Sequence, residues 1–132
     1  MSFPVKHISI SIKRKVEDVY AFASNPANLP RWAAGLSGSK IVNSGKDWIC
    51  ESPMGQVKVR FADANTYGIM DHDVTLPSGD INHNPFRVFK NDDGSEVVFT
   101  LFRLPQMSDS DFAQDTRFIE DDLKALKKIL EK

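Results

Sequence analysis

The sequence lacks most of the residue patterns from which common functional sites are built. Its single cysteine, Cys50, excludes an internal disulfide and a cysteine cluster for zinc. Its seven glycines are spread among turns and form no phosphate-binding loop, and no spacing supports a Ser/His/Asp or Cys/His triad. We therefore expect no cofactor and no bound metal, and we leave open whether the protein is an enzyme.

Charge and hydropathy exclude two further classes of partner. The net charge is −1, which argues against a phosphate-binding surface and hence against nucleic acid. No apolar run approaches the roughly 20 residues of a membrane helix, so we expect no membrane insertion. The first residues, MSFPVKHISI, contain no secretory hydrophobic region. The expected location is therefore the cytoplasm.

The first part of the chain predicts one strand and two short helices. Alternating isoleucines indicate a strand over residues 5–14. Apolar residues three and four apart predict a helix that begins near Val16. Asn25 followed by Pro26 is typical of a helix start and predicts a second short helix that carries Trp32.

The rest of the chain predicts an antiparallel sheet followed by one long helix. Turn signals recur every 10–14 residues up to Leu104, which is typical of a meander of about six strands. Ser108 and Asp111 form a capping-box pattern at the start of an amphipathic helix. The chain has 132 residues, of which 41% are hydrophobic, and no internal linker. We predict one α+β domain over residues 1–132, with about seven strands in all.

Strand alternation predicts the pairing within this sheet. A two-residue loop at Asn65-Thr66 would place Arg60 opposite Asp71, Lys58 opposite Asp73, Phe61 opposite Met70 and Val59 opposite His72. A turn at Met54-Gly55 would place Trp48 opposite Phe61, Cys50 opposite Val59 and Glu51 opposite Lys58. One face then carries the apolar side chains, namely Trp48, Cys50, Val57, Val59, Phe61, Met70, His72 and Val74.

Pro85 and Arg103 decide which side chains near the last strands are expected to face inward. Proline inside a strand indicates an edge or a bulge, and a bulge at Pro85 would turn Phe86 and Val88 inward and Arg87 outward. On the last strand, alternation places Arg103 on the inward face.

Several segments together resemble a known superfamily. These are VEDVYAFASNPANLPRWA (16–33), SPMGQVKVRFADANTYGIMDHDVTLPSG (52–79) and GSEVVFTLFRLPQMSDSDFAQDTRFIEDDLKALKKILE (94–131). The chain resembles the START-like, or helix-grip, superfamily, in particular its polyketide cyclase/dehydrase-like and small bacterial SRPBCC members. The resemblance implies a curved antiparallel sheet around the C-terminal helix, with an apolar cavity between them. It implies no shared catalytic motif.

The segment Asp71-His72-Asp73 contains the densest set of chemically capable side chains. Consecutive strand residues point to opposite faces, so His72 cannot share a metal with its neighbours. The two aspartates are expected on the solvated face. His72 is expected on the apolar face, either as a buried neutral imidazole or as a polar anchor or acid–base group of a pocket. Its possible inward partners are Arg103, Asp115 and Asp122.

Three functions remain open from the sequence. The first is binding of a small hydrophobic or aromatic molecule, such as a lipid, in the cavity. The second is a polyketide cyclase/dehydrase-like enzyme that uses His72. The third is a protein-interaction module resembling chaperone ATPase activators, or a homodimer, with Val98 and Phe102 on the outer face. For the first, the expected ligand-binding residues are Trp32, Trp48, Val59, Phe61, Met70, His72, Phe99, Arg103, Phe112 and Ile119.

Overall fold

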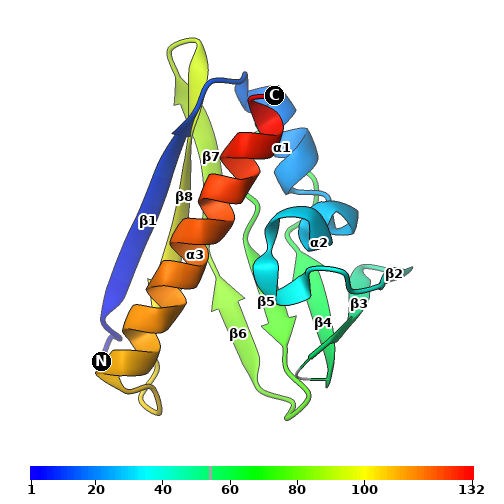
Figure 1. The fold of residues 1–132 in the computed structure, drawn as a ribbon, viewed down its shortest axis with the longest axis vertical. Coiled ribbons are helices and arrows are strands. Elements are labelled where there is room, and N and C mark those ends of the chain that lie inside the picture. The colour runs from blue at the N-terminus through cyan, green and yellow to red at the C-terminus, as the bar shows by residue number, and fades with distance from the viewer. Residues whose placement is uncertain (54) are drawn as a thin grey trace.

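The computed structural model describes residues 1–53 and 55–132 and shows a curved sheet around one long helix (Figure 1). The helix-grip fold expected from the sequence is confirmed. The elements in chain order are β1 (Val5–Ile12), α1 (Val16–Ala23), η1 (Pro26–Asn28), α2 (Leu29–Trp32), η2 (Ala34–Leu36), β2 (Ile41–Ser44), β3 (Asp47–Ser52), β4 (Gly55–Phe61), β5 (His72–Thr75), β6 (Ile81–Asn84), β7 (Phe86–Asn91), β8 (Gly94–Phe102) and α3 (Asp109–Leu130).

Two helical segments, η1 and α3, begin at the capping residues that the sequence predicts. The side chain of Asn25 accepts a hydrogen bond from the backbone N–H of Ala27, and Pro26 follows it at the first position of η1. At the start of α3, Ser108 and Asp111 form a complete capping box, in which each side chain bonds to the other residue's backbone N–H. No helix in the described part of the chain is long and apolar enough to cross a membrane.

The strands form two hydrogen-bonded groups that meet at a seam. One group has the order β1-β8-β7 and the other β2-β3-β4-β5-β6. Just before β5, the backbone N–H of Met70 donates to Phe86 on β7 (2.8 Å), and the N–H of Val88 donates to Gly68 (3.0 Å). The chain from Gly68 to Thr75 therefore pairs first with β7 and then with β6, which joins the two groups into one curved surface.

Pro85 marks the same seam on the next strand. It has no N–H to donate and separates β6 from β7, so the structure has eight strands rather than about seven. The predicted inward direction of Phe86 and Val88 is confirmed, and it follows a break between two strands at Pro85. Phe86 is fully buried opposite Phe99, Val88 is buried opposite Val97, and Arg87 is exposed.

Both hairpin registers differ from the prediction by two residues. On β4 and β5, Arg60 lies opposite Asp73, Phe61 opposite His72, Val59 opposite Val74 and Lys58 opposite Thr75. The predicted pairs of Arg60 with Asp71, Lys58 with Asp73, Phe61 with Met70 and Val59 with His72 are therefore wrong. A shift by two keeps every side chain on its predicted face, because the side-chain period of a strand is two.

The β4–β5 register differs because residues 62–71 form a long loop rather than a two-residue turn. The Asn65 side-chain oxygen accepts hydrogen bonds from the N–H groups of Tyr67 and Ile69 (both 3.0 Å). Its amide nitrogen donates to the Ile69 carbonyl (2.9 Å), and its own backbone N–H donates to the Tyr20 hydroxyl (3.0 Å). Asparagine commonly organises loops through such bonds.

The β3–β4 turn lies one residue earlier than predicted. Ser52 pairs with Gly55, so Trp48 lies opposite Val59, Cys50 opposite Val57 and Glu51 opposite Gln56. The predicted pairs of Trp48 with Phe61, Cys50 with Val59 and Glu51 with Lys58 are wrong. Met54, part of the predicted turn, lies outside the described residues.

The core lies between α3 and the inner faces of β1, β7 and β8. Along β1, Ile8 and Ile12 are buried and Ile10 is partly buried, as the alternation predicted. From α3, Leu123, Leu126 and Leu130 complete the core, with exposed fractions of 1%, 0% and 6%. Figure 1 shows α1 beside the C-terminal end of α3, and α2 further along the same side of the helix.

Candidate functional site

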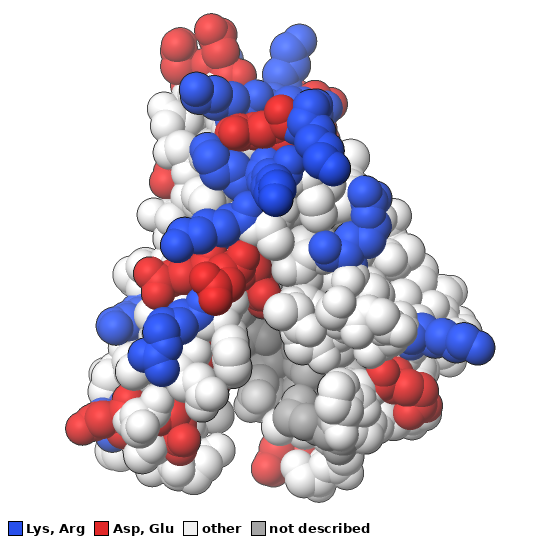
Figure 2. Space-filling view, in the orientation of Figure 1, with Lys and Arg blue, Asp and Glu red and all other residues white. Residues whose placement is uncertain are grey.

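A pocket of about 550 Å³ lies between the first half of α3, the α2–η2 segment and strands β4, β5 and β6. Figure 2 shows the hollow in the lower half of this face. The walls are mainly apolar and include Leu29, Leu36, Val57, Val59, Val74, Leu76, Phe99, Leu101, Phe118, Ile119 and Leu123. The polar groups in the wall are few, as is usual in pockets for small molecules.

The structure brings part of the predicted ligand-binding set together. Trp32, Val59, His72, Phe99 and Ile119 line the pocket. They come from α2, β4, β5, β8 and α3, which are far apart in the sequence. The fold therefore gathers them as the family resemblance implied.

Other predicted residues lie behind the wall or away from the pocket. Phe61 stacks on His72 with ring centroids 4.6 Å apart, and Met70 is fully buried in the core. Trp48 is partly buried on β3 without lining the pocket. Phe112 lies in the first turn of α3, with the Lys6 amino group 5.8 Å from its ring centroid.

The expectation that Arg103 turns inward is wrong. Arg103 follows the end of β8, its Nε donates to the Met107 carbonyl (3.4 Å), and its guanidinium forms an ion pair with Asp109. It thus joins the end of the sheet to the start of α3. The alternation that predicted its direction stops with the strand at Phe102.

His72 enters the pocket wall from β5 as a neutral imidazole. Its side chain is buried, and its Nδ1 lies 3.1 Å from the Met70 carbonyl oxygen. A carbonyl can only accept, so Nδ1 carries the proton and Nε2 carries the lone pair. Burial lowers the pKa of His72 from its usual value, although the Met70 carbonyl and Asp71 favour the charged form. The residue is therefore a hydrogen-bond acceptor for whatever enters the pocket.

The two aspartates beside His72 serve the sheet and not the pocket. Asp71 accepts hydrogen bonds from the N–H of Phe86 (2.8 Å) and from Arg87 (2.9 Å). Burial raises the pKa of Asp71, but the hydrogen bonds from Arg87 and Phe86 together outweigh this effect. The pKa of Asp71 therefore lies below its usual value. Asp73 pairs with His83 (2.6 Å) on β6.

Asp71 also satisfies the backbone where Pro85 interrupts the strand. It accepts the N–H of the residue that follows the proline, which would otherwise be left unpaired inside the seam. Across the part of the chain that the structure describes, no group of three or more His, Cys, Asp or Glu side chains could hold a metal ion.

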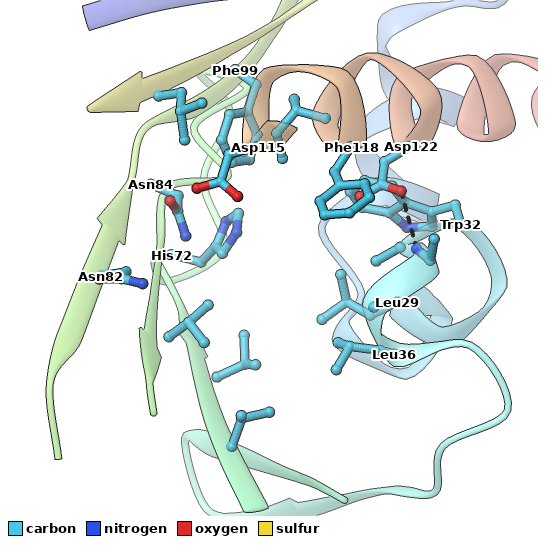
Figure 3. Close-up of a pocket in the computed structure, with 18 of the residues that line it drawn as sticks. Leu29, Trp32, Leu36, His72, Asn82, Asn84, Phe99, Asp115, Phe118 and Asp122 are labelled. Atoms are coloured by element: carbon cyan, nitrogen blue, oxygen red, sulfur yellow. Dashed lines mark hydrogen bonds between the residues drawn. The ribbon is translucent and has the colours of Figure 1, made fainter. Parts of the chain in front are cut away.

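Asp115 and Asp122 place two carboxyl groups in the pocket wall from α3 (Figure 3). One oxygen of Asp122 accepts the backbone N–H of Ala34 (3.0 Å), which joins α3 to η2. Burial raises the pKa of Asp122 to about 6, against the lowering effect of the Ala34 hydrogen bond and with a small contribution from Asp121. Burial also raises the pKa of Asp115, and Asp111 adds to the shift. Both carboxyl groups therefore titrate closer to neutrality than free ones.

Trp32 contributes a polar group that has no partner. The side chain is 6% exposed and lies against Phe86, with ring centroids 5.7 Å apart. Its indole N–H is buried and reaches no acceptor among the described residues. Buried N–H groups normally have a partner, so this donor, which lies beneath the surface of a residue of the pocket wall, is an exception.

Sequence reasoning missed the two amides of β6. Asn82 and Asn84 line the pocket, whereas Ile81 on the other face is 62% exposed. The usual rule places apolar residues inward, so the alternation of this strand gives the opposite signal. A second groove of about 380 Å³ adjoins here, shares Asn82, Asn84, Leu101 and Asp115 with the pocket, and continues to Phe3 and Met107.

Comparison with known proteins agrees with this architecture. The model of the family described as "Polyketide cyclase / dehydrase and lipid transport" matches residues 7–131. The chain belongs to this family. No curated protein matches the sequence. Both the family and the fold indicate a ligand-binding helix-grip domain.

Solved structures share the fold at low sequence identity. An uncharacterised protein from Bacillus thuringiensis has a TM-score of 0.77 at 18% identity, covering 98% of this chain and 100% of that one. The Aha1 dimer from Colwellia psychrerythraea has a TM-score of 0.75 at 17% identity, covering 97% and 96%. DynU16, from the dynemicin biosynthetic locus, has a TM-score of 0.73 at 12% identity, covering 97% of this chain and 47% of that one. Identities this low establish similarity of fold alone.

Proposed function

We propose that this protein binds a small hydrophobic or aromatic molecule in the pocket between α3 and strands β4, β5 and β6. The observation that carries the proposal is a pocket of about 550 Å³ with mainly aliphatic and aromatic walls. This volume is within the range of pockets that hold small organic ligands. Apolar surface removed from water contributes roughly 2.5 kcal/mol per 100 Å², from which the entropic cost of association must be subtracted.

The proposal is tested by filling the pocket. Val74 lines it from β5, and a phenylalanine at this position would occupy part of its volume. We expect Val74→Phe to weaken binding of an apolar fluorescent probe by roughly tenfold or more, because the ligand and the new ring compete for one space. Val42→Phe is the matched control, since Val42 is 61% exposed on β2 and away from the pocket.

Two measurements decide the outcome. Fluorescence titration gives the probe affinity of each variant, and native mass spectrometry of the protein from its own host detects a molecule that co-purifies. Absence of both probe binding and a co-purified molecule would contradict the proposal. Equal loss of affinity in Val42→Phe and Val74→Phe would show that the effect is not located in the pocket.

A second candidate function is catalysis by His72. The supporting observation is a neutral imidazole with its Nε2 lone pair in a wall that also carries Asp122, whose pKa is about 6. Environments that shift a histidine and a carboxyl group in opposite directions suit general acid–base chemistry near neutral pH. For a substrate found by incubating the protein with host metabolites, His72→Asn should abolish turnover and leave probe binding intact. Unchanged turnover would exclude this role.

The interaction-module function has weaker support from the surface. Val98 and Phe102, expected on an exposed outer face, are only partly exposed. The Colwellia protein is a dimer, which supports a homodimer of this chain as a candidate. Light scattering across a range of protein concentrations tests it, and a constant monomer mass would exclude it.

A further inference from the structure

The charged groups that line the pocket all have the same sign. Asp115 and Asp122 are in the wall, and no lysine or arginine is among the described residues that line the pocket or the adjoining groove. On the face shown in Figure 2, lysines and arginines gather mainly in the upper half, away from the hollow. A pocket that selects carboxylates would be expected to offer a cation, whereas the charged groups of this wall are two acids, and the amides of Asn82 and Asn84 can donate as well as accept.

Both acids have unused capacity to bind a donor. Asp122 uses one oxygen for the Ala34 N–H, and no donor among the described residues bonds to its other oxygen. Asp115 has no hydrogen bond or ion pair within the described chain and lies where the pocket meets the second groove. A partly buried carboxylate without a cationic partner is costly, so its presence in this wall calls for a partner from outside the chain.

The remaining polar groups of the wall agree with this. His72 presents the lone pair of Nε2 and is therefore an acceptor. The indole N–H of Trp32 is a donor, but its nitrogen is buried and offers no surface to a ligand. The two carboxylates and the imidazole accept hydrogen bonds, and the amides of Asn82 and Asn84 can serve either role, so a ligand that donates from its polar end satisfies this wall better than one that only accepts.

We propose that the pocket selects apolar molecules that carry a protonated amino group, which Asp122 and Asp115 bind, over molecules of the same shape that carry a carboxylate. This inference rests on the proposed function and adds the chemical class of the ligand. The ammonium group donates to the free oxygen of Asp122 and neutralises its charge, while the apolar part of the ligand lies against Val59, Val74 and Ile119. A carboxylate in the same place would meet like charges in a wall with no cation to compensate, which disfavours it.

Protonation of Asp122 should then oppose binding of the amine. Besides Asp122, the charged and titratable groups nearby are Asp121 and Asp115 on α3, His72 across the pocket and Arg31 on α2. Arg31 lies over the Phe22 ring (5.0 Å to its centroid). Burial raises the pKa of Asp122 to about 6, so affinity for an amine should rise as the pH increases from about 5 to 7.

The experiment compares three probes of nearly equal shape by isothermal titration calorimetry at pH 7.5. They are 1-naphthylethylamine, in which a two-carbon chain bears the amine, the corresponding alcohol, and 1-naphthylacetic acid. We expect the amine to bind roughly tenfold or more tighter than the alcohol, since hydrogen bonds to charged groups contribute about 1.5–3 kcal/mol. The acid should bind more weakly than the alcohol.

Variants locate the effect. Asp122→Asn keeps the shape and the acceptor for Ala34, and should remove most of the amine preference and its pH dependence, because the alcohol affinity should change much less than the amine affinity. Asp121→Asn makes the same charge change one residue away, outside the pocket wall, and should preserve the preference. Asp115→Asn should cause a smaller loss than Asp122→Asn, because Asp115 also borders the second groove, where water screens its charge more.

The outcomes separate this inference from the proposed function. If none of the three probes binds, the proposed function fails, and this inference fails with it. If all three bind equally, or if the acid binds best, the pocket binds apolar molecules but the amine selectivity is overturned. An amine preference that survives in both Asp122→Asn and Asp115→Asn also overturns it.

Discussion

The two halves of α3 have opposite environments. Towards the C-terminus, Leu123, Leu126 and Leu130 are buried against the strands and α1. Nearer the N-terminus, Phe118 is 52% exposed and Asp115 is partly buried in the wall of an open pocket, which extends along the helix to Asp122 and Leu123. The same helix therefore stabilises the fold mainly through its C-terminal end and lines the candidate site with side chains between positions 115 and 123. Beyond the seam at Pro85, strands β4, β5 and β6 face α3 across the pocket, whereas β1 packs against the helix directly.

Truncation of one aliphatic side chain in each half should show the largest contrast. Leu126→Ala removes a fully buried side chain and should lower the free energy of unfolding by about 2–5 kcal/mol. Ile119→Ala truncates a partly exposed side chain that already faces empty space, and should cost less than about 1.5 kcal/mol. Urea unfolding of both variants measures the difference. Equal losses would mean that the pocket side is as tightly packed as the core.

The seam between the two strand groups is the next test. Gly68 has a φ of +72°, and a Cβ there would overlap the Val88 carbonyl oxygen. Gly68→Ala should therefore cost more than about 2 kcal/mol, since backbone strain and the clash add together. Gly38 has nearly the same φ, +73°, with open space around it, so Gly38→Ala should show the strain alone, about 1 kcal/mol. Similar unfolding free energies for the two variants would exclude a close approach at the seam.

The smallest predicted effect is a gain in stability when Asp122, a candidate binding residue, is replaced by asparagine. The pKa of Asp122 is about 6 in the folded protein and 3.8 for an unperturbed aspartate, which represents the unfolded chain. Between these two pH values the folded state therefore binds more protons than the unfolded state. The contribution of Asp122 to the free energy of unfolding should therefore fall as the pH rises from about 4 to 6. The Asp122→Asn variant has no carboxyl group to ionise here, so it does not lose this stability. It should be more stable than wild type by about 1 kcal/mol at pH 7, after allowance for the partial exposure of the group.

Unfolding measured at several pH values checks this prediction. The stability difference between Asp122→Asn and wild type should be near zero at pH 4 and reach its full size by pH 7. Asp121→Asn is the control and should show no such growth. If Asp122→Asn is destabilised at pH 7, the carboxylate is a structural cap for η2 and its charge is not held at a cost.

Local sequence patterns predicted the helices and strands well, because these elements depend on residues only a few positions apart in the sequence. The strand at Val5–Ile12, the capping box at Ser108 and the inward turn of Phe86 after Pro85 all follow from backbone geometry and period. The inward direction of His72 follows from the same alternation. The partners of these strands did not follow, since one asparagine, Asn65, replaced a tight turn by a long loop and moved the register by two residues.

The composition of the pocket was only partly accessible from the sequence. The residues that do line it, such as Val59 and Ile119, lie on apolar faces that periodicity identifies. Asn82 and Asn84 are polar residues on the face that lines the pocket, which contradicts that periodicity. Arg103 lies just beyond the end of β8, where the alternation of the strand no longer applies. Which face of an element lines a void and which fills a core depends on the distance to the facing element, and that distance has no local signal.

The sequence by itself determined the order of elements, the capping of the helices and the face of the sheet to which His72 belongs, because these depend on side chains a few positions apart. Only the tertiary structure decided that α3 is packed towards its C-terminus and borders a pocket over residues 115–123. It also decided that two aspartates, a neutral histidine and Trp32 line the same pocket. The physical reason is the curvature of the sheet at Pro85 and Gly68, which sets the space between elements distant in the chain.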